Sequence, residues 1–188
     1  MEVLERATKQ WEQEGKLGWR DLEARPFLGF KHTVAEAYEY AGKLNQALEH
    51  YQAILSADEG DPLGVRFRIL SIYARTLQWQ KAEELANAYK DGDHHWDDQI
   101  IVPLLVAAIV TDREVAARSL MEDLITVNLN LSTLLTSEDP YAMIIDLSSS
   151  KLYRSNSIES LALLSAICCR LWCILFMSWS GCGILMRS

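Results

Sequence analysis

The chain has 188 residues, of which 49% are hydrophobic and 23% are charged, as expected for a soluble globular protein or a short stack of repeats. Its net charge of -8 argues against a nucleic-acid partner, because sequence-independent affinity for phosphates comes from Lys and Arg. Four prolines and nine glycines are too few for a turn-rich all-β fold.

Residues 1–26 are expected to form an N-terminal helix and a lead-in. Apolar side chains at Val3, Leu4, Ala7 and Trp11 follow helical spacing, and Gly15 is suited to end the helix. No apolar segment typical of a secretory signal is present here. All four cysteines lie after residue 167, so the body of the chain has no disulfide framework, and we expect a cytoplasmic protein.

Three helix pairs are predicted between residues 27 and 128. Because the loops within the pairs are short, the two helices of each pair must pack antiparallel. The predicted helices span residues 27–41 and 44–57, residues 63–75 and 79–89, and residues 100–110 and 114–127.

The three pairs repeat at a constant interval. Ala47, Ala82 and Ala117 lie 35 residues apart, each one turn into the second helix of its pair. Tyr38 and Tyr73 precede the first two alanines by nine residues, where a ring can fill the space beside a small side chain; Ala108 takes that position in the third pair. Since one hairpin cannot bury its apolar face alone, hairpins of this kind are expected to stack.

The first pair resembles the tetratricopeptide repeat (TPR) family. It carries the family's residue types and spacing at Tyr38, Gly42, Ala47, Tyr51 and Leu55, followed by Pro62. The second pair keeps Tyr73, Trp79 and Ala82 but has Leu77 at the turn and Ala86 in place of a large residue. The third keeps only Ala117 and Leu124, with Asp112 at the turn. The lead-in, residues 19–28, is similar to that of bacterial TPR proteins of unassigned function. The resemblance implies an all-α right-handed solenoid of about three units with flanking helices; a non-repeat helical bundle is the alternative.

In the family that the chain resembles, ligands bind a concave face built from the first helix of each pair. Carried onto this sequence, the alignment gives a strip that runs from acidic through basic to apolar, suited to an extended peptide or a helix. His32 and Glu36 stand where a family subtype that binds carboxylates needs Lys and Asn, so we expect no such activity. The predicted partner-binding residues are His32, Glu36, Tyr40, Phe67, Arg68, Ser71, Arg75, Gln99 and Val106.

Residues 129–188 are expected to form a C-terminal helical cap with an atypical apolar tail. A short helix is predicted over 129–135, a break at 137–140, and a last helix starting at a capping box formed by Asn156 and Glu159. Between residues 160 and 186 the only charged residue is Arg170. Three interpretations of the tail stay open: a buried capping helix, a membrane segment over 171–186, or an aberrant end that was not selected as a core.

No catalytic signature is found, and no metal or cofactor is expected. Asp93, His94, His95, Asp97 and Asp98 carry ligand-type side chains, but adjacent residues rarely converge on one ion, and Asp97 or Asp98 is better suited to cap the next helix. We therefore expect a non-enzymatic adaptor that binds a protein or peptide. The alternatives are a TPR protein anchored to a membrane by its tail and a non-catalytic helical subunit of an enzyme complex. The sequence does not indicate an oligomeric state.

Overall fold

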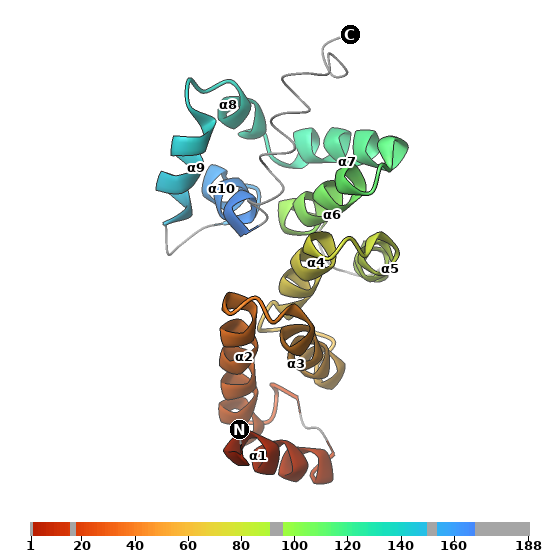
Figure 1. Ribbon diagram of the computed structural model, residues 1–188, viewed down its shortest axis with the longest axis vertical. Helices are drawn as coiled ribbons and strands as arrows, with labels where there is room; N and C mark the ends of the chain where they lie inside the picture. The colour runs from red at the N-terminus through yellow and green to blue at the C-terminus, as the bar shows by residue number, and fades with distance from the viewer. Residues whose placement is uncertain (1, 16–17, 91–95, 150–153, 168–188) are drawn as a thin grey trace. The chain divides into compact units, whose positions relative to one another are not determined.

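The computed structural model describes residues 2–15, 18–90, 96–149 and 154–167, and over these ranges the secondary structure is entirely helical (Figure 1). The chain forms two compact units, unit 1 (residues 1–72) and unit 2 (residues 73–188), with the boundary inside α4. The helices are α1 (Glu2–Gln13), α2 (Ala24–Tyr40), α3 (Leu44–Ala57), α4 (Val65–Arg75), α5 (Trp79–Lys90), α6 (Asp98–Val110), α7 (Glu114–Val127), α8 (Leu131–Leu135), α9 (Pro140–Ser148) and α10 (Ile158–Ile167).

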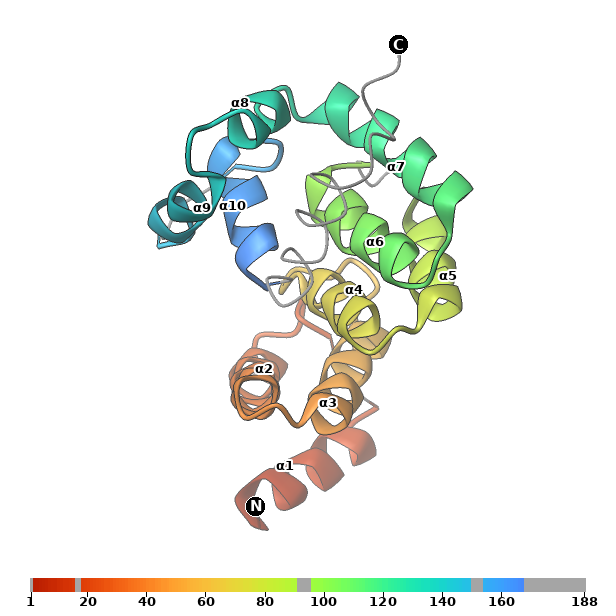
Figure 2. The same ribbon diagram turned by 45° about the horizontal axis from the view of Figure 1, so that its top comes forward.

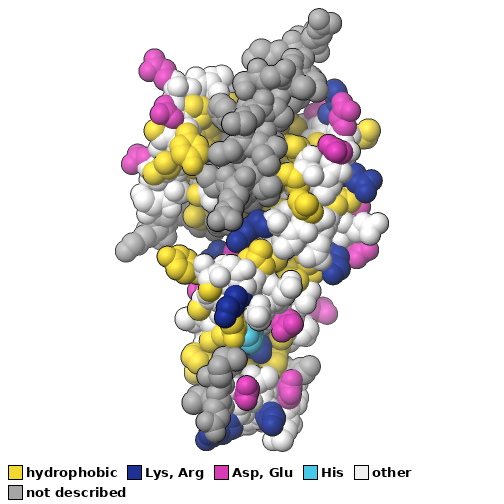
Figure 3. All heavy atoms as spheres, viewed as in Figure 1, with side chains coloured by type: hydrophobic (Ala, Val, Ile, Leu, Met, Phe, Trp, Pro, Cys, Tyr) yellow, Lys and Arg dark blue, Asp and Glu magenta, His cyan; other side chains and the backbone are white. Residues whose placement is uncertain are grey.

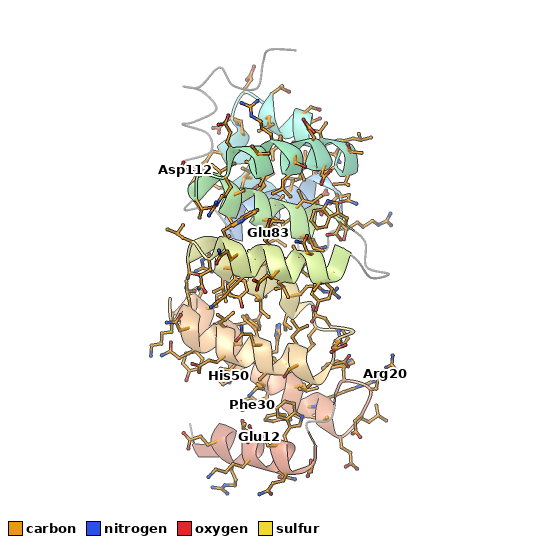
Figure 4. The ribbon with its side chains drawn as sticks, turned by 90° about the vertical axis from the view of Figure 1, so that its right-hand side faces the viewer. Glu12, Arg20, Phe30, His50, Glu83 and Asp112 are labelled. Carbon is orange, nitrogen blue, oxygen red and sulfur yellow. The ribbon has the colours of Figure 1, made fainter. Side chains whose placement is uncertain are left out.

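Unit 1 is built around the antiparallel pair of α2 and α3 (Figure 1). Leu28 and Ala35 on α2 and Ala47 and Tyr51 on α3 are buried, with one face of each helix turned to the core. His50 of α3, labelled in Figure 4, stacks on Tyr38 with ring centroids 5.5 Å apart. Burial, and then the nearby Lys31 charge, lower the pKa of His50, which favours the neutral ring.

Helix α1 is attached to α2 through aromatic and cationic side chains. The ring of the buried Trp11 lies 5.3 Å from that of Phe27. The Lys31 ammonium lies 5.7 Å from the centroid of each of these rings, within the range of a cation–π interaction. The lead-in is fixed to the end of α3, since the backbone N–H of Trp19 donates to the Asp58 carboxylate at 3.0 Å.

Unit 2 is built around α6, which packs against α5, α7 and α10, while α10 also packs against α8 and α9 (Figure 2). Helix α6 is apolar on all sides, and its residues from Ile100 to Ala108 are all buried. A helix without a polar face needs neighbours around it. Helix α10 therefore covers a side of α6 that α5 and α7 leave open.

The three hairpin turns have the same backbone geometry. Gly42, Leu77 and Asp112 adopt positive φ values of 74°, 59° and 55°, and Asp112 is labelled at the α6–α7 turn in Figure 4. The N–H of the following residue donates to the carbonyl oxygen of Tyr38, Tyr73 and Ala108 at 2.8, 2.9 and 2.8 Å. This is the Schellman ending of a helix. The 35-residue interval is thus present in the backbone of three successive turns.

The three spaced alanines also occupy equivalent backbone positions. The N–H groups of Ala47, Ala82 and Ala117 donate to the carbonyl oxygens of Lys43, Gln78 and Arg113, in the first turn of each second helix. Their environments differ, because Ala47 and Ala82 are fully buried whereas Ala117 is half-buried. The third pair therefore has the same turn geometry, while its alanine is less completely buried than those of the first two pairs.

Several predicted helix boundaries need correction. Helix α2 begins at Ala24, so Pro26 lies in its first turn, where the missing N–H has no intrahelical partner to lose. Helix α9 was not predicted; it starts at Pro140, and the Asp139 carboxylate accepts from the Ala142 N–H. The predicted capping box at Asn156 is wrong, because the N-cap of α10 is the Ser157 hydroxyl, which accepts from the Ser160 N–H at 3.1 Å. Asp97 does cap α6, accepting from the Gln99 N–H.

Two groups of sequence predictions fall outside the described residues. The first concerns the cysteines and the apolar tail, residues 168–188, and the second concerns Asp93, His94 and His95. Among the helices that are described, none has the length and apolarity needed to cross a membrane.

Candidate functional site

An ion pair between α2 and α4 is the centre of the candidate site in unit 1. The Arg68 guanidinium donates to the Glu36 carboxylate at 3.0 Å, and the exposed fractions of these side chains are 34% and 43%. Although the two residues are 32 positions apart in the chain, the packing of α4 beside α2 brings them together. The pair is therefore formed by tertiary structure and is open to solvent.

On the core side of this ion pair, Arg68 lies near a carboxylate that takes part in a buried hydrogen bond. The Tyr51 hydroxyl of α3 donates to the Glu39 carboxylate at 3.1 Å, and both side chains are buried. A second Arg68 nitrogen lies 3.8 Å from the same carboxylate. Burial, and then the charge of Glu39, raise the pKa of Tyr51, so its hydroxyl stays protonated as the donor. Glu39 thus connects the core to the exposed guanidinium.

His32 lies one turn before Glu36 on the same side of α2. Its Nδ1 is 3.6 Å from the Glu36 carboxylate, a contact that is an ion pair only when the ring is protonated. The ring packs edge-on against Tyr51, with centroids 5.7 Å apart. His32, Glu36, Glu39, Tyr51 and Arg68 form one group, which we call the α2–α4 cluster.

The α2–α4 cluster keeps unused hydrogen-bonding capacity. Within the described residues, Arg68 donates a single hydrogen bond, to Glu36, although a guanidinium has five N–H donors. Its charge, however, is balanced by Glu36 and Glu39. The predicted basic middle of the strip is therefore neutralised at Arg68, and the remaining donors suit a neutral carbonyl oxygen better than a carboxylate.

The other predicted residues of unit 1 are not brought into this cluster. Tyr40 is 97% exposed at the end of α2. Phe67 is half-buried, and the Arg66 guanidinium lies 5.4 Å above its ring. Ser71 is buried, and among the described atoms its hydroxyl has no hydrogen-bond partner. Phe67 and Ser71 are therefore part of the packing of α4.

Arg75, Gln99 and Val106 lie in unit 2. The Gln99 amide donates to the Ser155 hydroxyl at 2.8 Å and holds the segment before α10. Val106 is fully buried within α6, so the expectation that it lines an open surface needs correction. Helix α6 has no polar face to turn toward solvent. Its sequence pattern therefore does not indicate which of its sides pack against neighbouring helices.

A buried polar network in unit 2 was not expected from the sequence. The Asp98 carboxylate accepts hydrogen bonds from the Asn128 amide at 2.8 Å, from the backbone N–H of Asn156 at 3.0 Å and from the Ser160 hydroxyl. In return the Asn156 side chain accepts from the Asp98 N–H at 3.1 Å, and Asn156 has a positive φ of 62°. We call these four residues the Asp98 network. It joins the starts of α6 and α10 to the end of α7.

Asp97 lies beside this network and has an altered acidity. Burial, and then the neighbouring Asp98 charge, raise the pKa of Asp97, although hydrogen bonds from Ser155 and from backbone N–H groups partly offset this effect. In the part of the chain that is described, no group of three metal-ligating side chains is found. Because every polar atom of the Asp98 carboxylate has a partner within the fold, the network has a structural role.

Charge is mixed on the part of the surface that Figure 3 draws. On the face drawn in Figure 3, Lys and Arg side chains are interspersed with Asp and Glu, without a large area of one sign. Comparison of the chain with protein-family models, with curated proteins and with solved structures gave no match.

Proposed function

We propose that the chain is an interaction adaptor of TPR-like helical hairpins, which binds an extended peptide or a helix of a protein partner. The observation that carries this proposal is the half-exposed Glu36–Arg68 pair, set on a buried base of Glu39 and Tyr51. Recurrence of one turn geometry at residues 42, 77 and 112 supports the hairpin-repeat arrangement. Repeat proteins of this kind use helix surfaces for binding and need no chemical step.

Recognition would depend on the geometry of the α2–α4 cluster. Glu36 and Glu39 hold the Arg68 guanidinium in one orientation, so little side-chain entropy remains to be lost on binding. Its remaining N–H groups can donate to backbone carbonyl oxygens of a peptide, while Glu36 can accept from a peptide N–H or Lys side chain. A partner with a neutral or basic segment fits this surface better than an acidic one.

A charge swap tests the proposal. The variant Glu36→Arg/Arg68→Glu/Glu39→Gln keeps an ion pair in place and reverses its direction. Glu39→Gln is included because the buried Glu39 carboxylate, 3.8 Å from Arg68, would otherwise repel a carboxylate at position 68. Circular dichroism establishes that the variant is folded. Exposed Glu83 on α5, labelled in Figure 4, provides the matched control Glu83→Lys. Proteins captured from a cell extract by the unmodified chain, and identified by mass spectrometry, should be lost by the swapped variant and kept by the control. Capture of the same proteins by a folded, swapped variant would refute binding at this cluster.

A further inference from the structure

The outer side of α2 has an unusual composition. The buried residues Ala24, Leu28, Lys31, Ala35 and Glu39 define the inner face of this helix. With 3.6 residues per turn, the opposite face is formed by Pro26, Phe30, Thr33, Ala37 and Tyr40, and all five are exposed. The solvent face of an amphipathic helix normally carries charged residues. This face, which we call the α2 outer stripe, has none.

Open space lies at the centre of the stripe. Gly29 borders it, and a methyl group added at Gly29 would meet no other atom within 4 Å. The Thr33 hydroxyl is turned back to its own helix, since it donates to the Gly29 carbonyl oxygen at 3.0 Å. Gly29, Thr33 and Ala37 thus form a row of small side chains on successive turns of α2, which allows another helix to approach closely. Phe30, labelled in Figure 4, and Tyr40 provide larger apolar groups on the two sides of this centre.

The stripe is complementary to itself when the helix direction is reversed. A two-fold axis through Thr33, perpendicular to the helix, places Ala37 opposite Gly29 of a second copy, and Tyr40 opposite Pro26 of that copy. Small residues then meet at the centre, and each Tyr40 ring lies at the level of the Pro26 ring of the other copy. This is the property that an isologous interface requires, since the same patch must fit itself.

The charges next to the stripe follow the same symmetry. Glu23 precedes α2 and Lys43 follows it, and both side chains are exposed. The antiparallel arrangement brings Lys43 of one copy to the level of Glu23 of the other, and it does so twice. A parallel arrangement would instead place like charges at the same level, which is unfavourable.

We propose that a second copy of the chain docks on the α2 outer stripe as an antiparallel, two-fold symmetric dimer. This surface is on the side of α2 away from the buried face, and its central residues are distinct from the α2–α4 cluster. Dimerisation therefore does not depend on the adaptor proposal. If both hold, the protein presents two copies of the α2–α4 cluster, which raises its avidity for a multivalent partner.

Sedimentation equilibrium over a range of protein concentrations tests the dimer. The mass of the unmodified chain should rise with concentration from 21.4 kDa toward twice that value. Thr33→Glu places two carboxylates at the symmetry axis, and Gly29→Leu adds a bulky side chain at a position where an added Cβ has open space. Each variant should weaken association by at least about tenfold, since desolvated like charges or steric overlap then oppose contact. The control Gln46→Glu, at an exposed position on α3, should dimerise as the unmodified chain does.

A cross-linking measurement tests the register. Under mild oxidation, T33C chains should be joined through position 33, whereas Q46C chains should not be joined through position 46; peptide mapping separates these links from any formed by the native cysteines. The proposal is overturned if the unmodified chain stays at 21.4 kDa at every concentration. It is equally overturned if both stripe variants dimerise normally, or if position 33 fails to cross-link in a protein that dimerises.

Discussion

The α2–α4 cluster of unit 1 and the Asp98 network of unit 2 are made from similar side chains in opposite surroundings. Both join helices that are distant in the chain through a carboxylate, 32 residues away for Glu36 and up to 62 for Asp98. Glu36 is 43% exposed, however, whereas Asp98 has no exposed surface. Water can replace a lost partner in the first case and cannot in the second. Burial, rather than residue type, therefore separates a polar group that holds the fold from one that is available to a partner.

The largest expected effect follows from removing the centre of the buried network. Asp98→Ala leaves the Asn156 N–H and the Ser160 hydroxyl without their acceptor, and the Asn128 amide with one bond fewer. We expect the free energy of unfolding of unit 2 to fall by about 3–5 kcal/mol, because each orphaned buried donor costs roughly 1–3 kcal/mol. Urea unfolding, together with hydrogen exchange of α10 amides, measures this loss.

Exposed Asp146 on α9 provides the control for that change. Asp146→Ala should alter the stability by no more than about 0.5 kcal/mol, the range of ordinary surface substitutions. If Asp98→Ala were as mild as Asp146→Ala, the network would not be the element that holds α10 to α6.

A smaller loss is expected in unit 1 when the buried base of the cluster is cut. Tyr51→Phe removes the hydroxyl that donates to the buried Glu39 carboxylate, and we expect a cost of about 1–3 kcal/mol. Thermal unfolding measures this cost. A Tyr51→Phe variant as stable as the parent would show that this hydrogen bond has no structural role.

Asp97 predicts a pH dependence of moderate size. Because the folded-state pKa of Asp97 is raised above 3.8, folding favours its protonated form, so its contribution to stability is present at low pH and is lost as the pH rises through the raised value. Asp97→Asn keeps an acceptor at the N-cap and removes the charge. The variant should therefore gain stability relative to the parent as the pH is raised from about 4 to 7 in urea-unfolding series. A difference that shrinks toward neutral pH would contradict the stated direction.

The smallest of these effects concerns a turn. Leu77 adopts a φ of 59°, where Gly42 stands in the first hairpin, and a side chain in this region is strained by about 1–2 kcal/mol. Leu77→Gly should raise the midpoint of thermal unfolding, with a net gain of about 0.5–1 kcal/mol after the added chain entropy of glycine. Leu77→Ala is the control, since it shortens the side chain and keeps the strain. Equal stability of the two variants would mean that strain at this turn is negligible.

Much of the fold was predictable because it depends on local signals. Helices α3 and α7 match their predicted bounds, and the hairpin turns expected near residues 42, 77 and 112 are found to share one backbone geometry. Helix α9 was not predicted because it is short and its N-cap and first residue, Asp139 and Pro140, belong to a Ser-Glu-Asp-Pro segment that is also typical of a break. The N-cap of α10 was misassigned because Asn156 and Ser157 are both good caps, and contact with Asp98 decides between them.

The candidate site was less predictable, because sequence spacing does not give pairing between distant residues. The resemblance selected Glu36 and Arg68 separately, as acidic and basic parts of a strip, and their neutralisation of one another appears only when α4 packs beside α2. The Asp98 network joins residues 30, 58 and 62 positions apart, and no short motif marks it. The two polar residues Asp98 and Gln99, at the start of an otherwise apolar helix, were the one signal available.

The substitution Glu36→Ala, which leaves the Arg68–Glu39 contact in place, tests most directly whether the α2–α4 cluster is free to bind a partner. Exposed ion pairs contribute about 0–1 kcal/mol, so the free energy of unfolding in urea should fall by less than about 1 kcal/mol. A fall of about 3 kcal/mol or more, as expected for Asp98→Ala, would contradict the account, because the pair would then be part of the structural core rather than a surface available for recognition.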